Sequence, residues 1–227
     1  MIDACIFDLD GVIVDTARYH YMAWKRLADH LEIPFSEEDN EALKGISRMA
    51  SLEHLISLGE KTYSDIDKQK FCLTKNTWYV ESIEEMSSEN ILPGVTRFLN
   101  ELRENNIKIA LGSASKNARR VLELIDLTSV FEVIVDGNDV INSKPDPEVF
   151  LKGAQMLGCA PSRCVVFEDS AKGIDAAVSG GFMSVGIGPE QHLGHADMTL
   201  SSFEEVTVSD IRSRLQSVTQ ATSTVAS

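Results

Sequence analysis

The sequence predicts an α/β fold, in which helices cover a parallel β-sheet and an all-helical domain is inserted after the first strand. Two patterns carry this prediction. Between residues 95 and 187, short apolar runs alternate with amphipathic helical patterns, which is typical of a parallel sheet with helices on both faces. By contrast, residues 16–88 have apolar positions at helical spacing and no convincing strand.

The first strand is predicted at residues 4–7, a short apolar run that ends at Asp8. After Pro93-Gly94 the predicted elements are, in order, a helix over 95–102, a strand over 107–112, a helix over 117–125, a strand over 132–135, a helix over 147–157, a strand over 164–167, a helix around 174–178 and a strand over 183–187. The continuous apolar character of these runs fits strands that are buried on both faces.

These patterns divide the chain into three parts. We expect a Rossmann-like parallel sheet core formed by residues 1–15 and 89–216, interrupted by an inserted all-helical cap domain of four or five helices over 16–88. Residues 217–227 are small and polar with few apolar anchors, and are predicted to form a disordered tail.

Composition excludes several classes of partner. The formal net charge of −14 would repel a phosphate backbone, so we expect no nucleic-acid binding. No apolar run approaches the roughly 20 residues that span a bilayer, and no membrane association is expected. The four cysteines form no CxxC pair or disulfide framework, which predicts a reduced, cytoplasmic protein.

Polar clusters follow four of the predicted elements of the core. Asp8 and Asp10 follow the first strand, and residues two apart on an extended chain point the same way. Ser113 follows the second strand, Lys144 precedes a helix, and Glu168-Asp169 ends a later strand. Because ligands of open parallel sheets bind beyond the carboxyl ends of the strands, we expect these clusters to form one site.

The charges of this cluster indicate a metal. Four carboxylates in one crevice, from Asp8, Asp10, Glu168 and Asp169, would repel each other, and a divalent cation with Lys144 would nearly balance them. Carboxylates without imidazole or thiolate suit Mg²⁺. Such a site can admit a phosphoryl group, with Asp8 as nucleophile, Asp10 as general acid and base, and Ser113 holding phosphate oxygens.

The motifs Asp8-Leu9-Asp10-Gly11-Val12, Ser113, Lys144 and Glu168-Asp169 resemble, in order and spacing, the four motifs of the haloacid dehalogenase superfamily. The resemblance covers essentially the whole core. It implies that Asp8 becomes phosphorylated. It also implies that Mg²⁺ is held by Asp8, the backbone carbonyl of Asp10 and Asp169, with Glu168 in support.

The predicted cap carries a second resemblance. Residues 15–20, 23–24, 43–48 and 75–76, together with 114–117 of the core, look like the superfamily's glucose-phosphate mutases. This implies a monomeric enzyme that interconverts β-glucose 1-phosphate and glucose 6-phosphate through glucose 1,6-bisphosphate, with His20 either hydrogen-bonded to Asp10 or assisting closure of the cap. The substrate-binding residues it implies are Trp24, Lys44, Gly45, Ile46, Ser47, Arg48, Ser51, Lys75, Ala114, Ser115, Lys116 and Asn117.

Two other functions remain open at this point. A magnesium-dependent sugar-phosphate phosphatase would keep Asp8, Asp10, Lys144 and Asp169 but would have no need of Arg48. A non-catalytic sugar-phosphate sensor would have no use for Asp10. Individual side chains also have structural interpretations: Trp24 is typical of a cap core, and residues 115–117 could cap a helix.

Overall fold

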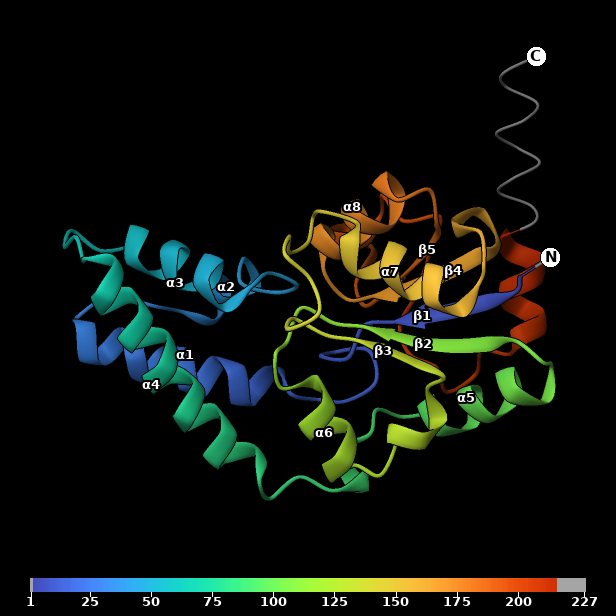
Figure 1. The fold of residues 1–227 in the computed structure, drawn as a ribbon, viewed down its shortest axis with the longest axis horizontal. Helices are drawn as coiled ribbons and strands as arrows, with labels where there is room; N and C mark the ends of the chain where they lie inside the picture. Colours follow the sequence, from blue (N-terminus) through green and yellow to red (C-terminus); the bar gives the residue numbers. More distant parts are fainter. Residues whose placement is uncertain (1, 216–227) are drawn as a thin grey trace, which may run out of the picture.

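The computed structural model describes residues 2–215, and its centre is one six-stranded sheet (Figure 1). The strand order is β3-β2-β1-β4-β5-β6, and all neighbouring strands run parallel. The strands are β1 (Ala4–Phe7), β2 (Lys108–Gly112), β3 (Val133–Val135), β4 (Cys164–Glu168), β5 (Met183–Ile187) and β6 (Met198–Leu200). The Rossmann-like parallel sheet is therefore confirmed, and β6 is the one strand of this sheet that we did not predict.

Helices cover both faces of the sheet because successive side chains of each strand point to opposite sides. Cys5 and Phe7 of β1 belong to one apolar cluster with α5 and α6, whereas Ala4 and Ile6 belong to a second cluster with α7 and α8. Figure 1 shows these two helix pairs on opposite sides of the sheet. The helices are α5 (Val95–Glu104), α6 (Ala118–Leu124), α7 (Glu148–Leu157) and α8 (Ala171–Ser179).

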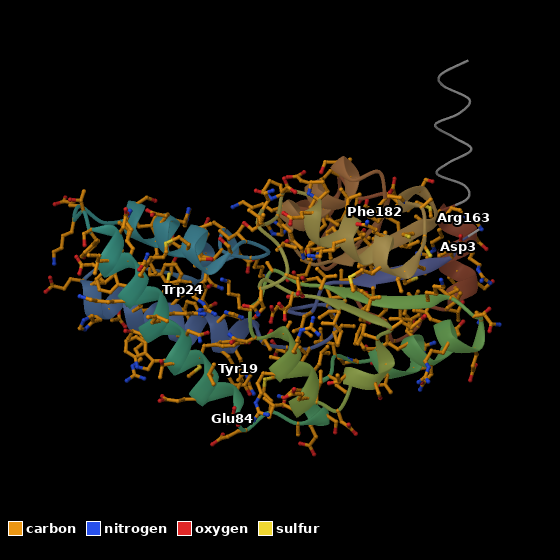
Figure 2. The ribbon with its side chains drawn as sticks, viewed as in Figure 1. Asp3, Tyr19, Trp24, Glu84, Arg163 and Phe182 are labelled. Atoms are coloured by element: carbon orange, nitrogen blue, oxygen red, sulfur yellow. The ribbon has the colours of Figure 1, made fainter. Side chains whose placement is uncertain are left out.

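Four α-helices follow β1 in the sequence before the chain returns to the core, and Figure 1 shows them beside the sheet. They are α1 (Ala17–Leu31), α2 (Glu37–Glu41), α3 (Arg48–Ser57) and α4 (Asp65–Ile83). Three of them begin after a serine whose hydroxyl accepts a backbone N–H of the first turn, namely Ser36, Ser47 and Ser64. Residues of α1, α3 and α4 form an apolar cluster that contains Trp24, which Figure 2 places among these helices. Ala23 of α1 and Tyr79 and Ile83 of α4 belong instead to the cluster of the sheet and α5.

Short elements complete the described chain. They are the 3₁₀ turns η1 (Ser88–Asn90), η2 (Thr128–Val130) and η3 (Pro161–Arg163), the helix α9 (Glu190–Leu193) and a final helical stretch at 208–215. The tail predicted at 217–227 lies outside the described residues. No helix within residues 2–215 combines the length and apolar composition that crossing a bilayer requires.

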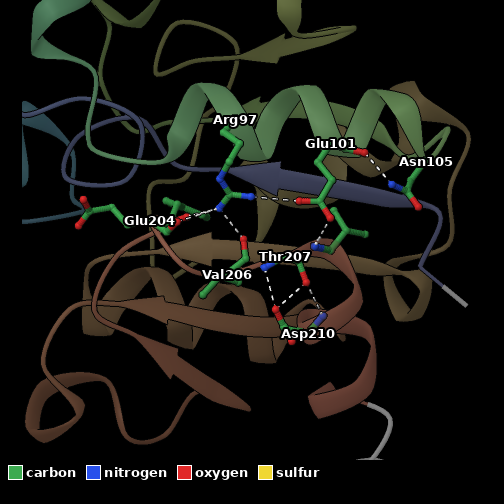
Figure 3. A network of polar contacts seen from close by, with 9 residues as sticks. Arg97, Glu101, Asn105, Glu204, Val206, Thr207 and Asp210 are labelled. Atoms are coloured by element: carbon green, nitrogen blue, oxygen red, sulfur yellow. Dashed lines mark hydrogen bonds and ion pairs between the residues drawn. The ribbon is translucent and has the colours of Figure 1, made fainter.

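The last described segment is fixed to α5 by a polar network (Figure 3). The Nη2 atom of Arg97 donates to the carbonyl oxygens of Phe203, at 2.6 Å, and Val206, at 2.7 Å. The Oε1 atom of Glu101 accepts the backbone N–H of Val208 at 2.8 Å. Gly94, at φ +81°, leaves room for this segment, because a side chain there would collide with the carbonyl group of Phe203.

Candidate active site

The polar clusters predicted from the sequence meet at the carboxyl end of the central strands. The strand β1 has β2 on one side and β4 on the other, so the chain order reverses around it. This is the position at which open α/β sheets bind ligands. Asp8 directly follows β1, Ser113 directly follows β2, and Glu168 is the last residue of β4.

Lys144 holds two carboxylates at the base of this site. Its ammonium Nζ donates to Oδ1 of Asp8 at 2.6 Å and also to Oε1 of Glu168. The second oxygen of Glu168 accepts from the backbone N–H and hydroxyl of Ser170, at 3.0 and 2.9 Å. Burial opposes the charged form of Lys144, but the two carboxylates outweigh it and raise its pKa. Lys144 is therefore a fixed positive charge beside Asp8.

Two carboxyl groups of the site are short of positive charge. Burial raises the pKa of Asp8 well above its usual value; Lys144 opposes this shift, while Glu168, Asp10 and Asp169 add to it. Burial and the neighbouring Glu168 raise the pKa of Asp169 to about 7. Since a raised pKa means that the ionised form is disfavoured, an additional cation would stabilise both groups.

Asp10 has a different environment from Asp8. Its Oδ1 accepts the hydroxyl of Thr16, and Nε2 of His20 lies 3.7 Å from the same oxygen, too far for a direct hydrogen bond. Burial would raise the pKa of Asp10, but the contacts with His20 and Thr16 outweigh it and lower the pKa. Two neighbouring carboxyl groups thus have pKa values shifted in opposite directions, a pattern that suits separate nucleophile and acid–base roles.

A pocket of about 100 Å³ opens above these carboxylates, between the sheet core and the helices α1–α4. Most of the residues that the sequence predicted for the site line it. They are Asp8, Asp10, His20, Trp24, Lys44, Gly45, Ile46, Arg48, Ser51, Lys75, Ala114, Ser115, Lys116, Asn117 and Asp169. Trp24 therefore both lines the pocket and belongs to the apolar cluster of the cap helices.

The other four predicted site residues do not line this pocket. Lys144 and Glu168 lie buried behind Asp8. Ser113 is also buried, and its hydroxyl accepts the backbone N–H of Ser115 at 3.1 Å, so in this arrangement it orders the loop below the pocket. Ser47 caps α3 through the N–H of Ala50.

Basic side chains line the pocket from two directions. Arg48 and Lys75 come from α3 and α4, and Lys116 comes from the loop before α6. The ammonium of Lys75 lies 2.9 Å from Nδ1 of His20 and 4.7 Å from the Trp24 ring centroid. Burial and Arg48 lower the pKa of Lys75 to about 7. Within residues 2–215 neither Arg48 nor Lys116 pairs with an acidic side chain, which leaves both for an anion.

The pocket also contains residues that sequence reasoning missed. Ala17, Asn40 and Leu43 line it, and Thr16 contacts Asp10 from beneath. Ala17 lies one helical turn before His20, so the spacing of three could have indicated it. Leu43 directly precedes the predicted Lys44. Asn40 carried no signal, because its place at the pocket depends on the tertiary position of α2.

The residues present fit a magnesium ion. No group of three His, Cys, Asp or Glu side chains in the described part of the chain forms a preassembled cluster. The predicted ligand set requires only two such side chains, Asp8 and Asp169, with the backbone carbonyl of Asp10. A side chain at Gly11 would collide with the Asp169 carboxylate, so Asp169 lies directly against the loop that carries Asp10. Oxygen donors with raised pKa values suit a hard cation.

Fold and site together define a class of protein. The family model for haloacid dehalogenase-like hydrolases matches residues 2–181, and the chain belongs to this family. It is 42% identical over 207 residues to the β-phosphoglucomutase of Bacillus subtilis, covering 90% of this chain and 92% of that protein.

Two further comparisons extend this result. The crystal structure of a β-phosphoglucomutase from Clostridium difficile superposes with a TM-score of 0.92 at 43% identity, covering 96% of this chain and 98% of the other. A phosphorylated carbohydrates phosphatase of Thermotoga maritima is 33% identical over 79% of this chain and 82% of its own length. Both of the enzyme classes that the sequence left open therefore occur among its relatives.

Proposed function

We propose that the protein is an isomerase, a phosphomutase that interconverts β-D-glucose 1-phosphate and D-glucose 6-phosphate. The observation that carries the proposal is a pocket with two differently charged ends. Asp8, Asp10 and Asp169 line it from the ends of β1 and β4, whereas Arg48 and Lys75 line it from α3 and α4, and Lys116 from the loop before α6. A substrate with two phosphates needs one end for transfer and a separate cationic end for the group that does not react.

The reaction follows from the roles of Asp8 and Asp10. Phosphorylated Asp8 transfers its phosphoryl group to the 6-hydroxyl of β-glucose 1-phosphate, while Asp10 accepts the hydroxyl proton. The bisphosphate then reorients within the pocket, so that the phosphate at C1 faces Asp8. An oxygen of Asp8 attacks the phosphorus at C1, and Asp10 returns the proton to the leaving oxygen, which gives glucose 6-phosphate and phosphorylated Asp8.

A magnesium site agrees with the roles proposed for Asp8 and Asp10. Asp8, Asp169 and the backbone carbonyl of Asp10 would hold the ion, with Glu168 in support through Lys144. A bound Mg²⁺ supplies positive charge that stabilises the transferring phosphoryl group. Lys144 keeps Asp8 oriented, and the contacts that lower the pKa of Asp10 keep it ionised, which is the form that can accept the hydroxyl proton.

The cap is proposed to exclude water from the phosphorylated Asp8. Residues 16–88 would form this cap, and residues 1–15 and 89–216 the core. An apolar cluster that draws its helical residues from α1, α3 and α4 supports the division. Some of the contacts between the two parts lie at the pocket: Lys44 Nζ is 3.6 Å from Oδ2 of Asp169, and a side chain at Gly45 would collide with Ser170.

A coupled assay tests the proposal. Glucose 6-phosphate formed from β-glucose 1-phosphate is measured with Mg²⁺ and a trace of glucose 1,6-bisphosphate, alongside the release of free phosphate. We expect rapid isomerisation with little free phosphate. Free phosphate without isomerisation would instead establish the phosphatase function that the Thermotoga maritima relative is named for, and binding without turnover would establish a sensor.

We also propose that the protein is a cytoplasmic monomer. All four cysteines are unpaired, which suits a reducing compartment. The acidic surface, at a formal net charge of −14, disfavours self-association. Light scattering on a size-exclusion column would measure the mass directly, and a dimer mass would contradict the monomer.

A further inference from the structure

One polar contact joins the cap to the substrate-lining loop of the core. The Nδ2 atom of Asn117 donates to Oδ1 of Asn76 at 2.9 Å. Asn117 precedes α6 and lines the pocket, whereas Asn76 belongs to α4 and does not line it. The two residues are 41 positions apart, and the contact is partly buried. It therefore forms only when the cap lies against the core.

The Asn117 side chain does not cap α6, although its position would allow it. It stands at the N-cap position of α6, where asparagine commonly accepts a backbone N–H of the first turn, yet it makes no such bond. The neighbouring Ser115 hydroxyl instead accepts the backbone N–H of Asn117 at 3.2 Å. The contact with Asn76 is thus what selects the direction of the Asn117 amide.

Asn76 lies on the face of α4 that is turned toward the pocket, so it can link the direction of the Asn117 amide to the position of the cap. Cys72, Lys75, Asn76 and Tyr79 follow the i, i+3, i+4, i+7 spacing of one face of α4, and Lys75 on that face lines the pocket. One amide hydrogen of Asn117 is occupied by Asn76, which leaves the second hydrogen and the carbonyl oxygen for a ligand beside Lys116.

We propose that Asn76 is a positioning residue that orients Asn117 for the non-reacting phosphate group when the cap closes. The proposal rests on the mutase function above, since only a doubly phosphorylated sugar places a second phosphate in the pocket. Asn76 acts through Asn117 and does not touch the substrate. It makes the cationic end of the pocket complete only in the closed arrangement.

A second cap–core contact provides a matched control. Glu84, which lies at the end of α4 and is labelled in Figure 2, accepts two hydrogen bonds from Arg120 of α6, at 2.6 and 3.2 Å. This ion pair also joins the cap to the core, but neither residue lines the pocket and both are exposed. Glu84→Ala therefore loosens cap–core contact in general without changing the direction of Asn117.

The test is a double-mutant cycle on binding. Asn76→Ala, Asn117→Ala and the double variant are made in an Asp8→Asn chain, which prevents turnover, and glucose 1,6-bisphosphate binding is measured by calorimetry with Mg²⁺. We expect each single variant to weaken binding about threefold to tenfold, as loss of one hydrogen bond does. The double variant should bind no more weakly than Asn117→Ala alone, because the two residues act in series.

Two further measurements make the result specific. Phosphorylation of Asp8 by acetyl phosphate, which has no second phosphate, should keep its rate in Asn76→Ala with Asp8 intact. When Glu84→Ala is combined with Asn117→Ala, the losses in bisphosphate binding free energy of the two substitutions should add. Additive losses for Asn76 and Asn117, or an Asn76→Ala loss equal for acetyl phosphate and bisphosphate, would overturn the proposal. Absence of isomerisation by the unsubstituted enzyme would instead overturn the mutase function.

Discussion

The ammonium of Lys144 lies 2.6 Å from Oδ1 of Asp8, although the two residues are 136 positions apart in the chain. Both side chains are buried, and the same ammonium donates to Glu168. One cation thus compensates two carboxylates that would otherwise repel each other. The nucleophile of the proposed reaction depends on this arrangement for its orientation and for part of its ionisation.

Replacement of Lys144 by methionine should therefore affect both stability and chemistry. The variant leaves the buried carboxylates of Asp8 and Glu168 without their shared cation, which we expect to lower the free energy of unfolding by about 3–5 kcal/mol. The deficit should shrink as the pH falls, because burial already favours the protonated form of Asp8. Urea denaturation at pH 5 and pH 8 measures both effects, and an equal deficit at the two pH values would contradict this account.

The position of this triad could be predicted because parallel strands end at one edge of the sheet. Asp8 and Glu168 end neighbouring strands, and their meeting follows from strand order alone. The contact of Ser113 could not be predicted, since its hydroxyl accepts a backbone N–H of its own loop and the residue is buried outside the pocket lining. The strand β6 was missed because Met198–Leu200 is too short for an apolar pattern.

The cap was predictable as a helical segment but not in its contacts. His20 and Lys75 are 55 positions apart, and their approach depends on how α1 packs against α4. Helical spacing indicates which face of each helix is apolar, but does not fix which turns of two helices meet. For the same reason, the sequence indicated Asn76 only as the neighbour of Lys75. Its contact with Asn117 could not be predicted and is seen only in the structure.

Replacement of Asp8 by asparagine should abolish both isomerisation and phosphate release, with at least a roughly 10³-fold loss. The amide oxygen can still accept from Lys144, so the fold should persist. After incubation with acetyl phosphate and Mg²⁺, the unsubstituted protein should carry phosphate that alkali and hydroxylamine release, and the variant none. Phosphate found on Asp8→Asn at the level of the unsubstituted protein would rule out Asp8 as nucleophile.

Lys75 should make stability depend on pH. Its pKa is lowered to about 7 in the folded protein, because of burial and Arg48, from an ordinary value of 10.5. Between these values the unfolded chain binds more protons than the folded one, so stability should rise with pH, at up to about 1.4 kcal/mol per pH unit for this group. Below pH 7 both states carry the proton, and the dependence should vanish.

Comparison of Lys75→Met with the unsubstituted protein isolates this contribution. The difference in unfolding free energy between pH 7 and pH 9.5 should be smaller in Lys75→Met. Lys70→Met, an exposed lysine of the same helix, removes the same formal charge and should leave the pH dependence unchanged. A Lys75→Met profile parallel to that of the unsubstituted protein would show that Lys75 titrates normally.

Arg97 should stabilise the C-terminal part of the core. Its guanidinium joins α5 to the carbonyl groups of Phe203, Glu204 and Val206 (Figure 3). We expect Arg97→Ala to lower the free energy of unfolding by about 1–2 kcal/mol, a modest value because the side chain is partly exposed. Arg103→Ala, an exposed arginine on the same helix, is the control, and equal losses in thermal denaturation would contradict the network's role.

Arg48 should separate the mutase from a phosphatase. It lines the pocket with Lys116 and lacks an acidic partner among the described residues, so its planar guanidinium is free for a phosphate. Arg48→Ala should lower isomerisation of β-glucose 1-phosphate about 10- to 100-fold, the usual cost of losing a charge-assisted hydrogen bond. Hydrolysis of a generic phosphate ester should change little, since that substrate has no second phosphate. Arg26→Ala, a cap arginine that stacks on Trp78 away from the pocket, serves as the control. If Arg48→Ala reduces both reactions equally, the residue does not bind the second phosphate, and the cationic end of the pocket must serve another purpose.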